Sequence, residues 1–154
     1  MKKRLLLSLL TLTLTTSAIA YDTNMADRLN KFYSHMTQKA CADSKLFIEA
    51  QETMKMLRKN EKFTLLDIRT KGENAIITLS AFNSLHIPIE NLFEKENLAK
   101  LPTDKPIVIV CHSGTRALLG AIGLKQIGFK KVQVLKGGLV SLAKANSTKN
   151  APLL

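Results

Sequence analysis

The sequence predicts a three-layer α/β fold in which a central, mostly parallel sheet is flanked by helices. Segments with strand character alternate with segments of helical periodicity along most of the chain, which is the pattern of layered α/β proteins. Residues 107–110 are four consecutive β-branched residues between Pro106 and Cys111, as expected of a central strand covered on both faces. The length of 154 residues suits one ordinary domain with a hydrophobic core.

The first 20 residues have the pattern of a secretory signal peptide. A basic start at residues 2–4 precedes an apolar stretch at residues 5–14, and a small-x-small sequence ends at Ala20. We expect cleavage between Ala20 and Tyr21 and a periplasmic or secreted protein. An uncleaved membrane anchor is the alternative, but the apolar stretch is short for a bilayer span and contains several Ser and Thr residues. No stable membrane insertion is expected after cleavage.

The chain is basic, and this bears on its partners. The formal net charge of +11 falls to +8 when the three basic residues of the signal are removed. Lys residues are scattered along the sequence and aromatic residues do not interleave with them, so nucleic-acid binding is disfavoured. We expect the charge to aid solubility and to attract small anions weakly, such as sulfur oxyanions.

An amphipathic helix is expected directly after the signal. Asn24 and Asp27 offer an N-cap and a favourable first-turn charge. The helix belongs to an N-terminal helical extension at residues 21–44, which precedes the main domain at residues 45–146 and a flexible tail at residues 147–154. Core packing is the favoured role of its apolar stripe, ahead of partner binding. The stripe consists of Met25, Leu29, Phe32 and Met36.

Strands and helices alternate within the main domain. A turn is expected at Lys71-Gly72, and residues 75–82 have no clear preference. The expected strands cover residues 46–48, 63–68, 85–87, 107–110 and 132–135. One helix is expected to begin near residue 50, and three more are expected at residues 89–101, 115–127 and 139–145.

The loop from Cys111 to Arg116 lies between the central strand and a predicted helix. Ligands of open α/β sheets bind at the carboxyl ends of strands, where the free N–H groups of the next helix favour an anion. We expect these amides and Arg116 to favour the thiolate of Cys111, which is the nucleophilic form. Gly114 lets the backbone turn inward without a Cβ, and the planar fork of Arg116 suits an oxyanion. Further donors around a bound anion or terminal sulfur are His112, Ser113 and Thr115.

The two cysteines, Cys41 and Cys111, are too few for a disulfide scaffold and too far apart for a metal-binding Cys-x-x-Cys pair, so no metal site is expected. Burial in a core is the commoner role of a cysteine, but the polar residues, Gly and Arg after Cys111 favour a reactive thiol. Pairing of Cys41 with Cys111 in an oxidising compartment stays open as a less favoured alternative, because a disulfide needs Cα atoms within about 7 Å.

An ordered set of motifs lies within residues 46–145. It consists of Leu-Leu-Asp-Ile-Arg at 65–69 with Glu73, His-Ile-Pro at 86–88, the loop at 111–116, Gly128-Phe129, and Leu-Lys-Gly-Gly at 135–138. This set resembles the rhodanese superfamily. Two departures from the family pattern occur: residues 79–84 replace the usual Gly-His-Ile-Pro-Gly-Ala in a stretch about two residues longer, and the aromatic residue often found after the Gly-Gly turn is absent, with Leu142 nearby.

The resemblance implies a rhodanese-like three-layer fold and a sulfurtransferase activity. Cys111 would take a sulfane sulfur from a donor such as thiosulfate or polysulfide, hold it as a persulfide in the loop at residues 112–116, and pass it to cyanide or a thiol, including a protein sulfur acceptor. The covalent persulfide would replace a separate cofactor. Asp67 and Arg69 would belong to the scaffold near the site, and we interpret them as a strand-end salt bridge without a catalytic part.

Two other functions stay open. Cysteine phosphatases and arsenate reductases hold an oxyanion in a loop with five residues between Cys and Arg, whereas four residues separate Cys111 from Arg116. The shorter loop favours a single sulfur atom, although anion binding at the helix start is common to both. A rhodanese-like module that binds sulfur or a partner without turnover is the second alternative. The retained Cys111 and Arg116 are what a working site would need.

Overall fold

A computed structural model of the protein describes residues 20–149. The chain forms two compact units, Met1–His35 and Met36–Leu154. The predicted signal peptide lies outside the described residues except for Ala20, and so does the end of the predicted tail. Signal cleavage, tail flexibility and the predicted domain boundaries therefore stay predictions.

The first unit contains helix α1, Thr23–Tyr33. Its N-cap is Asp22, whose carboxylate accepts a hydrogen bond from the Met25 N–H at 2.9 Å. The expectation that Asn24 caps this helix is wrong, because the cap is Asp22, which stands before Asn24 in the chain. Asp27 does not supply the expected charge either, because the first turn contains no acidic residue. No residue of α1 is buried, so the apolar stripe does not form a core of its own.

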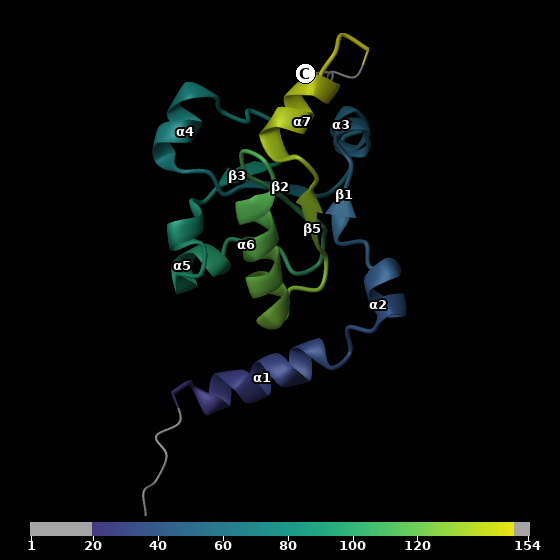
Figure 1. The fold of residues 1–154 in the computed structure, drawn as a ribbon. Helices are drawn as coiled ribbons and strands as arrows, with labels where there is room; N and C mark the ends of the chain where they lie inside the picture. The colour runs from purple at the N-terminus through teal and green to yellow at the C-terminus, as the bar shows by residue number, and fades with distance from the viewer. Residues whose placement is uncertain (1–19, 150–154) are drawn as a thin grey trace, which may run out of the picture. The chain divides into compact units, whose positions relative to one another are not determined.

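The second unit is built on a five-stranded sheet in which every described strand pair is parallel (Figure 1). The strand order is β1-β5-β4-β2-β3, which places β4 in the middle, as its β-branched sequence predicts. The predicted α/β class is therefore confirmed. The strands are β1 (Phe47–Ile48), β2 (Thr64–Asp67), β3 (Ser84–His86), β4 (Ile107–Val110) and β5 (Val132–Leu135).

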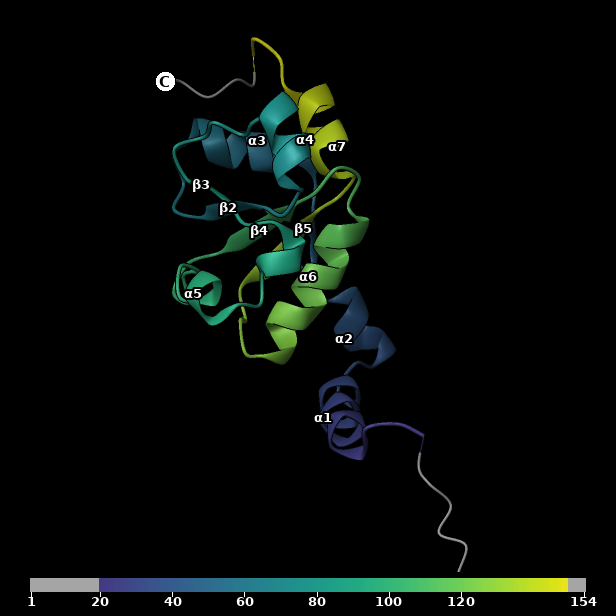
Figure 2. The ribbon, with the colours of Figure 1, turned by 90° about the vertical axis from the view of Figure 1, so that its left-hand side faces the viewer.

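Helices cover both faces of this sheet, giving three layers (Figure 2). Helices α5 and α6 lie on one side, and α3, α4 and α7 lie on the other. The helices of the second unit are α2 (Gln38–Ala42), α3 (Ala50–Arg58), α4 (Lys71–Ile76), α5 (Lys95–Leu98), α6 (Thr115–Gln126) and α7 (Gly138–Ala145), with a 3₁₀ turn at Ile89–Asn91.

The core is split by the sheet into two clusters because successive strand residues point to opposite faces. Val108 and Val110 of β4 pack with α3 and α7, whereas Ile109 packs with α6. All four residues of β4 are buried. The register pairs Asp67 of β2 with Val110 of β4, so the segments after these two strands leave the sheet side by side.

The sequence prediction is wrong at two points of this domain. The expected turn at Lys71-Gly72 is the first turn of α4, because Thr70 and Glu73 form a capping box that starts a helix there. The expected helix at residues 89–101 is two short pieces, the 3₁₀ turn Ile89–Asn91 and α5. Residues 77–83 link α4 to β3 without regular structure.

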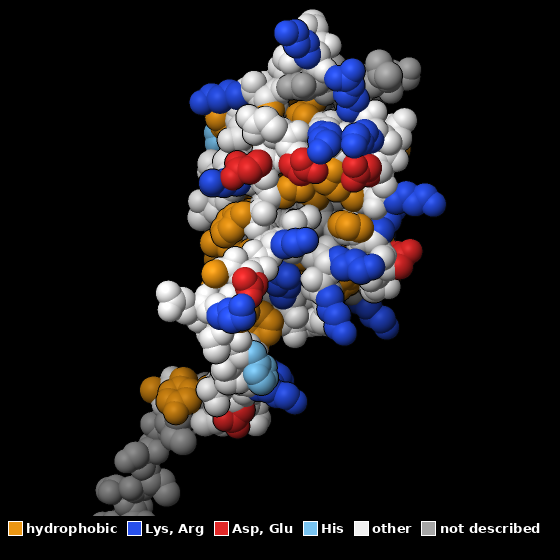
Figure 3. Space-filling view, turned by 90° about the vertical axis from the view of Figure 1, so that its right-hand side faces the viewer, with side chains coloured by type: hydrophobic (Ala, Val, Ile, Leu, Met, Phe, Trp, Pro, Cys, Tyr) orange, Lys and Arg blue, Asp and Glu red, His pale blue; other side chains and the backbone are white. Residues whose placement is uncertain are grey.

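Two further features of the described residues concern surface charge and helix length. On the face shown in Figure 3, Lys and Arg side chains are spread over the surface, and acidic side chains lie among them. Across residues 20–149, none of the helices combines the length and the apolar character required to span a bilayer.

Candidate active site

Cys111 directly follows the central strand β4, at the carboxyl edge of the sheet. Its side chain is 1% exposed and belongs to the core cluster on the α6 side. The Sγ atom accepts hydrogen bonds from two backbone amides, Gly114 N–H at 3.1 Å and Ala117 N–H at 3.4 Å. These donors stabilise negative charge on the sulfur. The loop therefore cradles the thiol as its position in the sequence predicts.

The turn that makes this cradle depends on Gly114. This residue has φ of 109° and is the N-cap of α6, a conformation that an L side chain rarely adopts. It offers no capping side chain. No side chain therefore caps the first turn of α6, and its Ala117 N–H donates to Cys111 Sγ instead.

A second turn, at Gly137 and Gly138, supports the loop from the side of α7. Both glycines have positive φ, 72° and 58°. The first amides of α7 donate to the loop carbonyls, Leu139 N–H to Cys111 O at 2.8 Å and Val140 N–H to His112 O at 3.2 Å. A Cβ at Gly138 would overlap the Cys111 carbonyl oxygen and the backbone of His112. Close backbone approach explains this Gly-Gly pair.

Arg116 forms a two-point ion pair with Glu73. Its two terminal nitrogens donate to the two carboxylate oxygens at 2.7 and 2.6 Å, and each side chain is about one third exposed, 31% and 33%. Hydrogen bonding to Glu73 is the main cause of the raised pKa of Arg116. Partial burial opposes this rise, and the interactions with Glu73 and Cys111 as charged neighbours add to it. The same pair holds the pKa of Glu73 well below its usual value.

This pair changes the expected role of Arg116. The planar fork was expected to bind an oxyanion, but both of its terminal nitrogens already bind a carboxylate. Glu73 also accepts from the Thr70 backbone N–H and hydroxyl, each at 3.0 Å. The carboxylate thus ties the start of α4 to the start of α6. Sequence reasoning missed Glu73 as a site residue, although its capping-box spacing from Thr70 was visible.

Asp67 and Arg69 form a second ion pair, at the end of β2. The Arg69 terminal nitrogen lies 2.6 Å from the Asp67 carboxylate, and the side chains are 3% and 2% exposed. Arg69 also donates to the Ile77 carbonyl at 2.7 Å, and its own carbonyl lies 2.8 Å from His86 Nε2. The expected strand-end salt bridge is therefore present, and it also holds the segment after α4.

The remaining loop side chains are less engaged than expected. His112, Ser113 and Thr115 are all exposed, so they surround the outside of the loop, while its backbone holds the sulfur. The two cysteines are both free, Cys111 buried and Cys41 exposed. The structure therefore brings together Cys111, the loop backbone and the Arg116–Glu73 pair.

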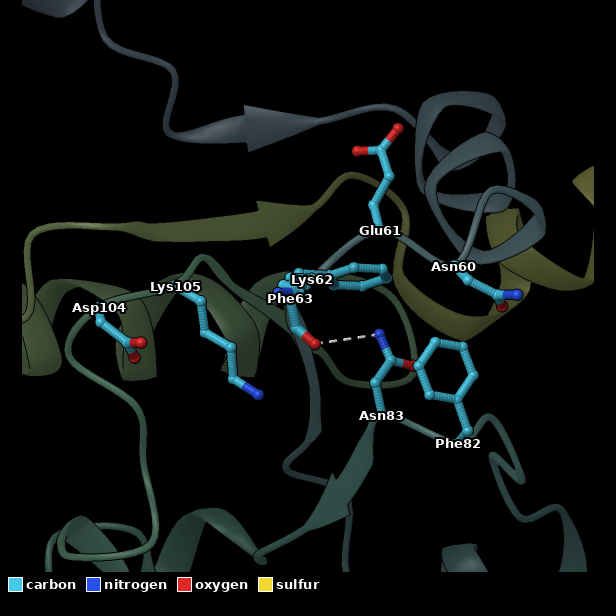
Figure 4. A pocket seen from close by; sticks show the side chains of 8 residues that line it. All are labelled: Asn60, Glu61, Lys62, Phe63, Phe82, Asn83, Asp104 and Lys105. Atoms are coloured by element: carbon cyan, nitrogen blue, oxygen red, sulfur yellow. Dashed lines mark hydrogen bonds between the residues drawn. The ribbon is translucent and has the colours of Figure 1, made fainter.

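A hollow of about 480 Å³ lies at the opposite edge of the sheet (Figure 4). Its lining includes Phe63, Asn83 and Lys105, which precede β2, β3 and β4 and so mark the amino edge of these parallel strands. Asn83 donates to the Phe63 carbonyl at 3.1 Å. Part of the segment that departs from the family pattern, including Phe82, thus lies away from Cys111.

Comparison with known proteins settles the family. The family model described as Rhodanese-like domain matches residues 49–145, which is more than half of the chain and includes strands β2 to β5 and the Cys111 loop. The chain belongs to the rhodanese-like domain family. This confirms the resemblance expected from the ordered motifs.

Curated relatives of this rhodanese-like domain carry names that refer to sulfur chemistry. The chain is 32% identical over 97 residues to "Probable adenylyltransferase/sulfurtransferase MoeZ" of Mycobacterium tuberculosis, covering 63% of this chain and 24% of that protein. It is 29% identical over 97 residues to a "Sulfurtransferase" of Allochromatium vinosum, covering 63% and 87%. The match thus spans about a quarter of the first relative and most of the second.

Solved structures have the same fold. A rhodanese-related protein from Thermoplasma volcanium is 26% identical, with a TM-score of 0.55 over 70% of this chain and 96% of that one. The human single-domain sulfurtransferase TSTD1 is 20% identical, with a TM-score of 0.58 over 68% of this chain and the whole of that one. The second likeness concerns the fold alone.

Proposed function

We propose that this protein is a rhodanese-type sulfurtransferase that carries sulfur on Cys111. The observation that supports this most directly is the buried Sγ held by the amides of Gly114 and Ala117. The family assignment and the relatives named as sulfurtransferases agree with it. The proposal covers the persulfide, its donors and its acceptors, which would include cyanide, a small thiol or a protein sulfur acceptor.

The proposed reaction has two steps at one sulfur atom. In the first, the Cys111 thiolate attacks the outer sulfur of a donor, an Sγ–S bond forms, the donor's bond to that sulfur breaks, and its electron pair leaves with the remaining fragment. With thiosulfate the fragment is sulfite; with a persulfide it is a thiolate. In the second step, a nucleophilic acceptor attacks the outer sulfur and Cys111 leaves as the thiolate. No external oxidant or reductant is needed.

The loop backbone would act in both steps. Two amides already donate to Sγ, so they would stabilise the thiolate before attack and again when Cys111 is the leaving group. Residues 112–116 would surround the terminal sulfur, and fixed amides need little reorganisation as charge moves. Export to the periplasm or beyond is part of the proposal and depends on the predicted signal peptide.

Oxyanion chemistry of the phosphatase type is disfavoured by one contact. Such a mechanism needs the loop arginine to bind the tetrahedral anion, whereas two of the five N–H donors of Arg116 already bind the Glu73 carboxylate, which also balances its charge. The four-residue separation of Cys111 from Arg116 favours the same conclusion.

Intact-mass spectrometry tests the proposal. The purified mature protein is exposed separately to thiosulfate, polysulfide and cysteine persulfide, and Cys111→Ser and Cys41→Ser are treated in the same way. We expect the wild type and Cys41→Ser to gain one cyanide-removable sulfur atom with at least one donor, and Cys111→Ser to gain none. Failure of the wild type to gain sulfur from any donor would reject the proposal.

A further inference from the structure

We propose that Glu73 makes the Cys111 site selective for organic persulfides over dianionic donors such as thiosulfate. This inference rests on the proposed sulfur transfer at Cys111 and names the donor class for it. It also makes Glu73 a specificity-determining residue, although no part of the proposed bond-making involves its carboxylate directly.

The first step of the argument is the charge of the loop. Arg116 is the loop's one cationic residue, since His112 is counted as neutral. Its guanidinium is already paired with the Glu73 carboxylate at 2.6 Å, and the proposed mechanism adds the attacking thiolate of Cys111 beside it. A dianion that approaches Sγ would therefore meet a group of charges with a net negative sum. An interaction between charges near a protein surface is strong enough to affect binding.

Two other cations near the site, Arg69 and Lys136, have acidic partners as well. Arg69 is buried against Asp67, and Lys136, next to the Gly-Gly turn, pairs with Glu49 at 2.8 Å. The overall positive charge of the protein is therefore not concentrated on the reacting sulfur. Long-range attraction of anions and recognition of a dianion at the loop are separate properties.

An exposed apolar side chain lies near each member of the ion pair on its own helix. Ile76 follows Glu73 by three residues on α4, and Leu119 follows Arg116 by three residues on α6, so each lies on the same helix face as its charged neighbour. Ile76 is 84% exposed and Leu119 is 61% exposed. An organic group attached to the sulfur could contact these side chains, whereas thiosulfate has no such group.

The proposed loading step balances without further reactants. Sγ of Cys111 attacks the outer sulfur of R–S–SH, the new Sγ–S bond forms, and the S–S bond of the donor breaks. The electron pair leaves as R–S⁻, and the proton stays on the transferred sulfur. The persulfide group of such a donor therefore brings at most one negative charge to the loop, whereas thiosulfate brings two.

Glu73→Gln is the variant that isolates the charge. Gln is accepted at the third position of a capping box, so the start of α4 and one hydrogen bond to Arg116 can be kept while the negative charge is removed. Glu96→Gln is the matched control, because Glu96 lies in the first turn of α5 and is exposed. Glu73→Asp keeps the charge and tests whether it, rather than the side-chain length, sets the preference.

The experiment measures the rate at which Cys111 gains one sulfur, by rapid quenching and mass spectrometry, with thiosulfate and with cysteine persulfide. We expect Glu73→Gln to raise the thiosulfate rate on the order of tenfold and to leave the persulfide rate within about twofold. Glu96→Gln and Glu73→Asp should keep the wild-type ratio of the two rates. Thermal unfolding of each variant verifies folding.

The outcomes separate this inference from the proposed function. An unchanged ratio in Glu73→Gln, with Cys111 still loaded by both donors, would overturn the selectivity and leave sulfur transfer intact. A wild type that gains no sulfur from any donor would reject both.

Discussion

Two Arg–carboxylate pairs follow neighbouring parallel strands of this protein, and they differ in burial. Arg69 and Asp67, at the end of β2, are 3% and 2% exposed, whereas Arg116 and Glu73, beside the loop after β4, are 31% and 33% exposed. The shortest N–O distance is 2.6 Å in both. The same chemistry therefore occurs in two dielectric environments only one strand apart in the sheet.

The difference separates a structural pair from a pair that can affect reactivity. A buried charge that loses its partner is strongly destabilising, so Arg69 and Asp67 fix the end of β2 and the segment after α4. A partly exposed pair contributes little to stability, but Arg116 and Glu73 set the charge beside Cys111. Stability should therefore respond to the first pair, and sulfur chemistry to the second.

The largest effect is expected from breaking the buried pair. Asp67→Ala leaves the Arg69 guanidinium buried without its carboxylate and should lower the free energy of unfolding by about 3–5 kcal/mol. Urea unfolding measures this, with the exposed Asp104→Asn as control. A loss below about 1 kcal/mol would show that the two pairs do not differ as burial suggests.

The contact between the two loops should give the next largest effect. Gly138→Ala places a Cβ against the Cys111 carbonyl and His112 at a positive φ, so it should destabilise the protein by about 1–3 kcal/mol and slow the loading of Cys111. Gly72→Ala is the matched control, because a Cβ there meets no atom within 4 Å. Equal stability and equal loading rates in the two variants would contradict the close approach of the Gly-Gly turn.

The exposed pair should be visible in acid. Because Arg116 lowers the pKa of Glu73 in the folded protein, its contribution is complete above the unfolded pKa of about 4.5 and is lost as the pH falls toward the folded pKa. We expect wild type to exceed Glu73→Gln in stability by about 1 kcal/mol or less at neutral pH. Urea unfolding at a series of pH values should show this difference shrinking below the usual Glu range. A difference that grows in acid would contradict the pair.

The smallest effect is expected from the loop side chain beside the cysteine. His112 is exposed, and its structural contact is its carbonyl, which accepts from Val140 N–H. His112→Ala should therefore keep the Cys111 loading rate within about twofold, measured with the same donor as the wild type. A tenfold fall would assign the imidazole a direct role in the chemistry.

Local sequence patterns predicted the strands and the position of Cys111 between a strand and a helix, because these features depend on neighbouring residues. The run at residues 107–110 identified the buried central strand, and Cys111 followed from its place before Gly114 and a helix. The turn expected at Lys71-Gly72 failed because the capping box of Thr70 and Glu73 favours a helix more strongly than Gly opposes it. A helical periodicity over residues 89–101 likewise did not prevent a break into two pieces.

The ion pair at the site was beyond local reasoning. Glu73 and Arg116 are 43 residues apart, and their contact exists only because β2 and β4 are neighbours in parallel register. The sequence alone therefore left Arg116 free to bind an oxyanion, and only the folded arrangement shows what already occupies it.

Discharge of a loaded Cys111 tests the central claim most directly. The protein is loaded with a sulfur donor, freed of excess donor, and mixed with cyanide, and thiocyanate and intact mass are measured together. We expect one thiocyanate for each sulfur lost, with return of the protein to its original mass and no product from Cys111→Ser. Sulfur that stays on the protein while no thiocyanate forms would contradict transfer and favour a module that binds sulfur without turnover.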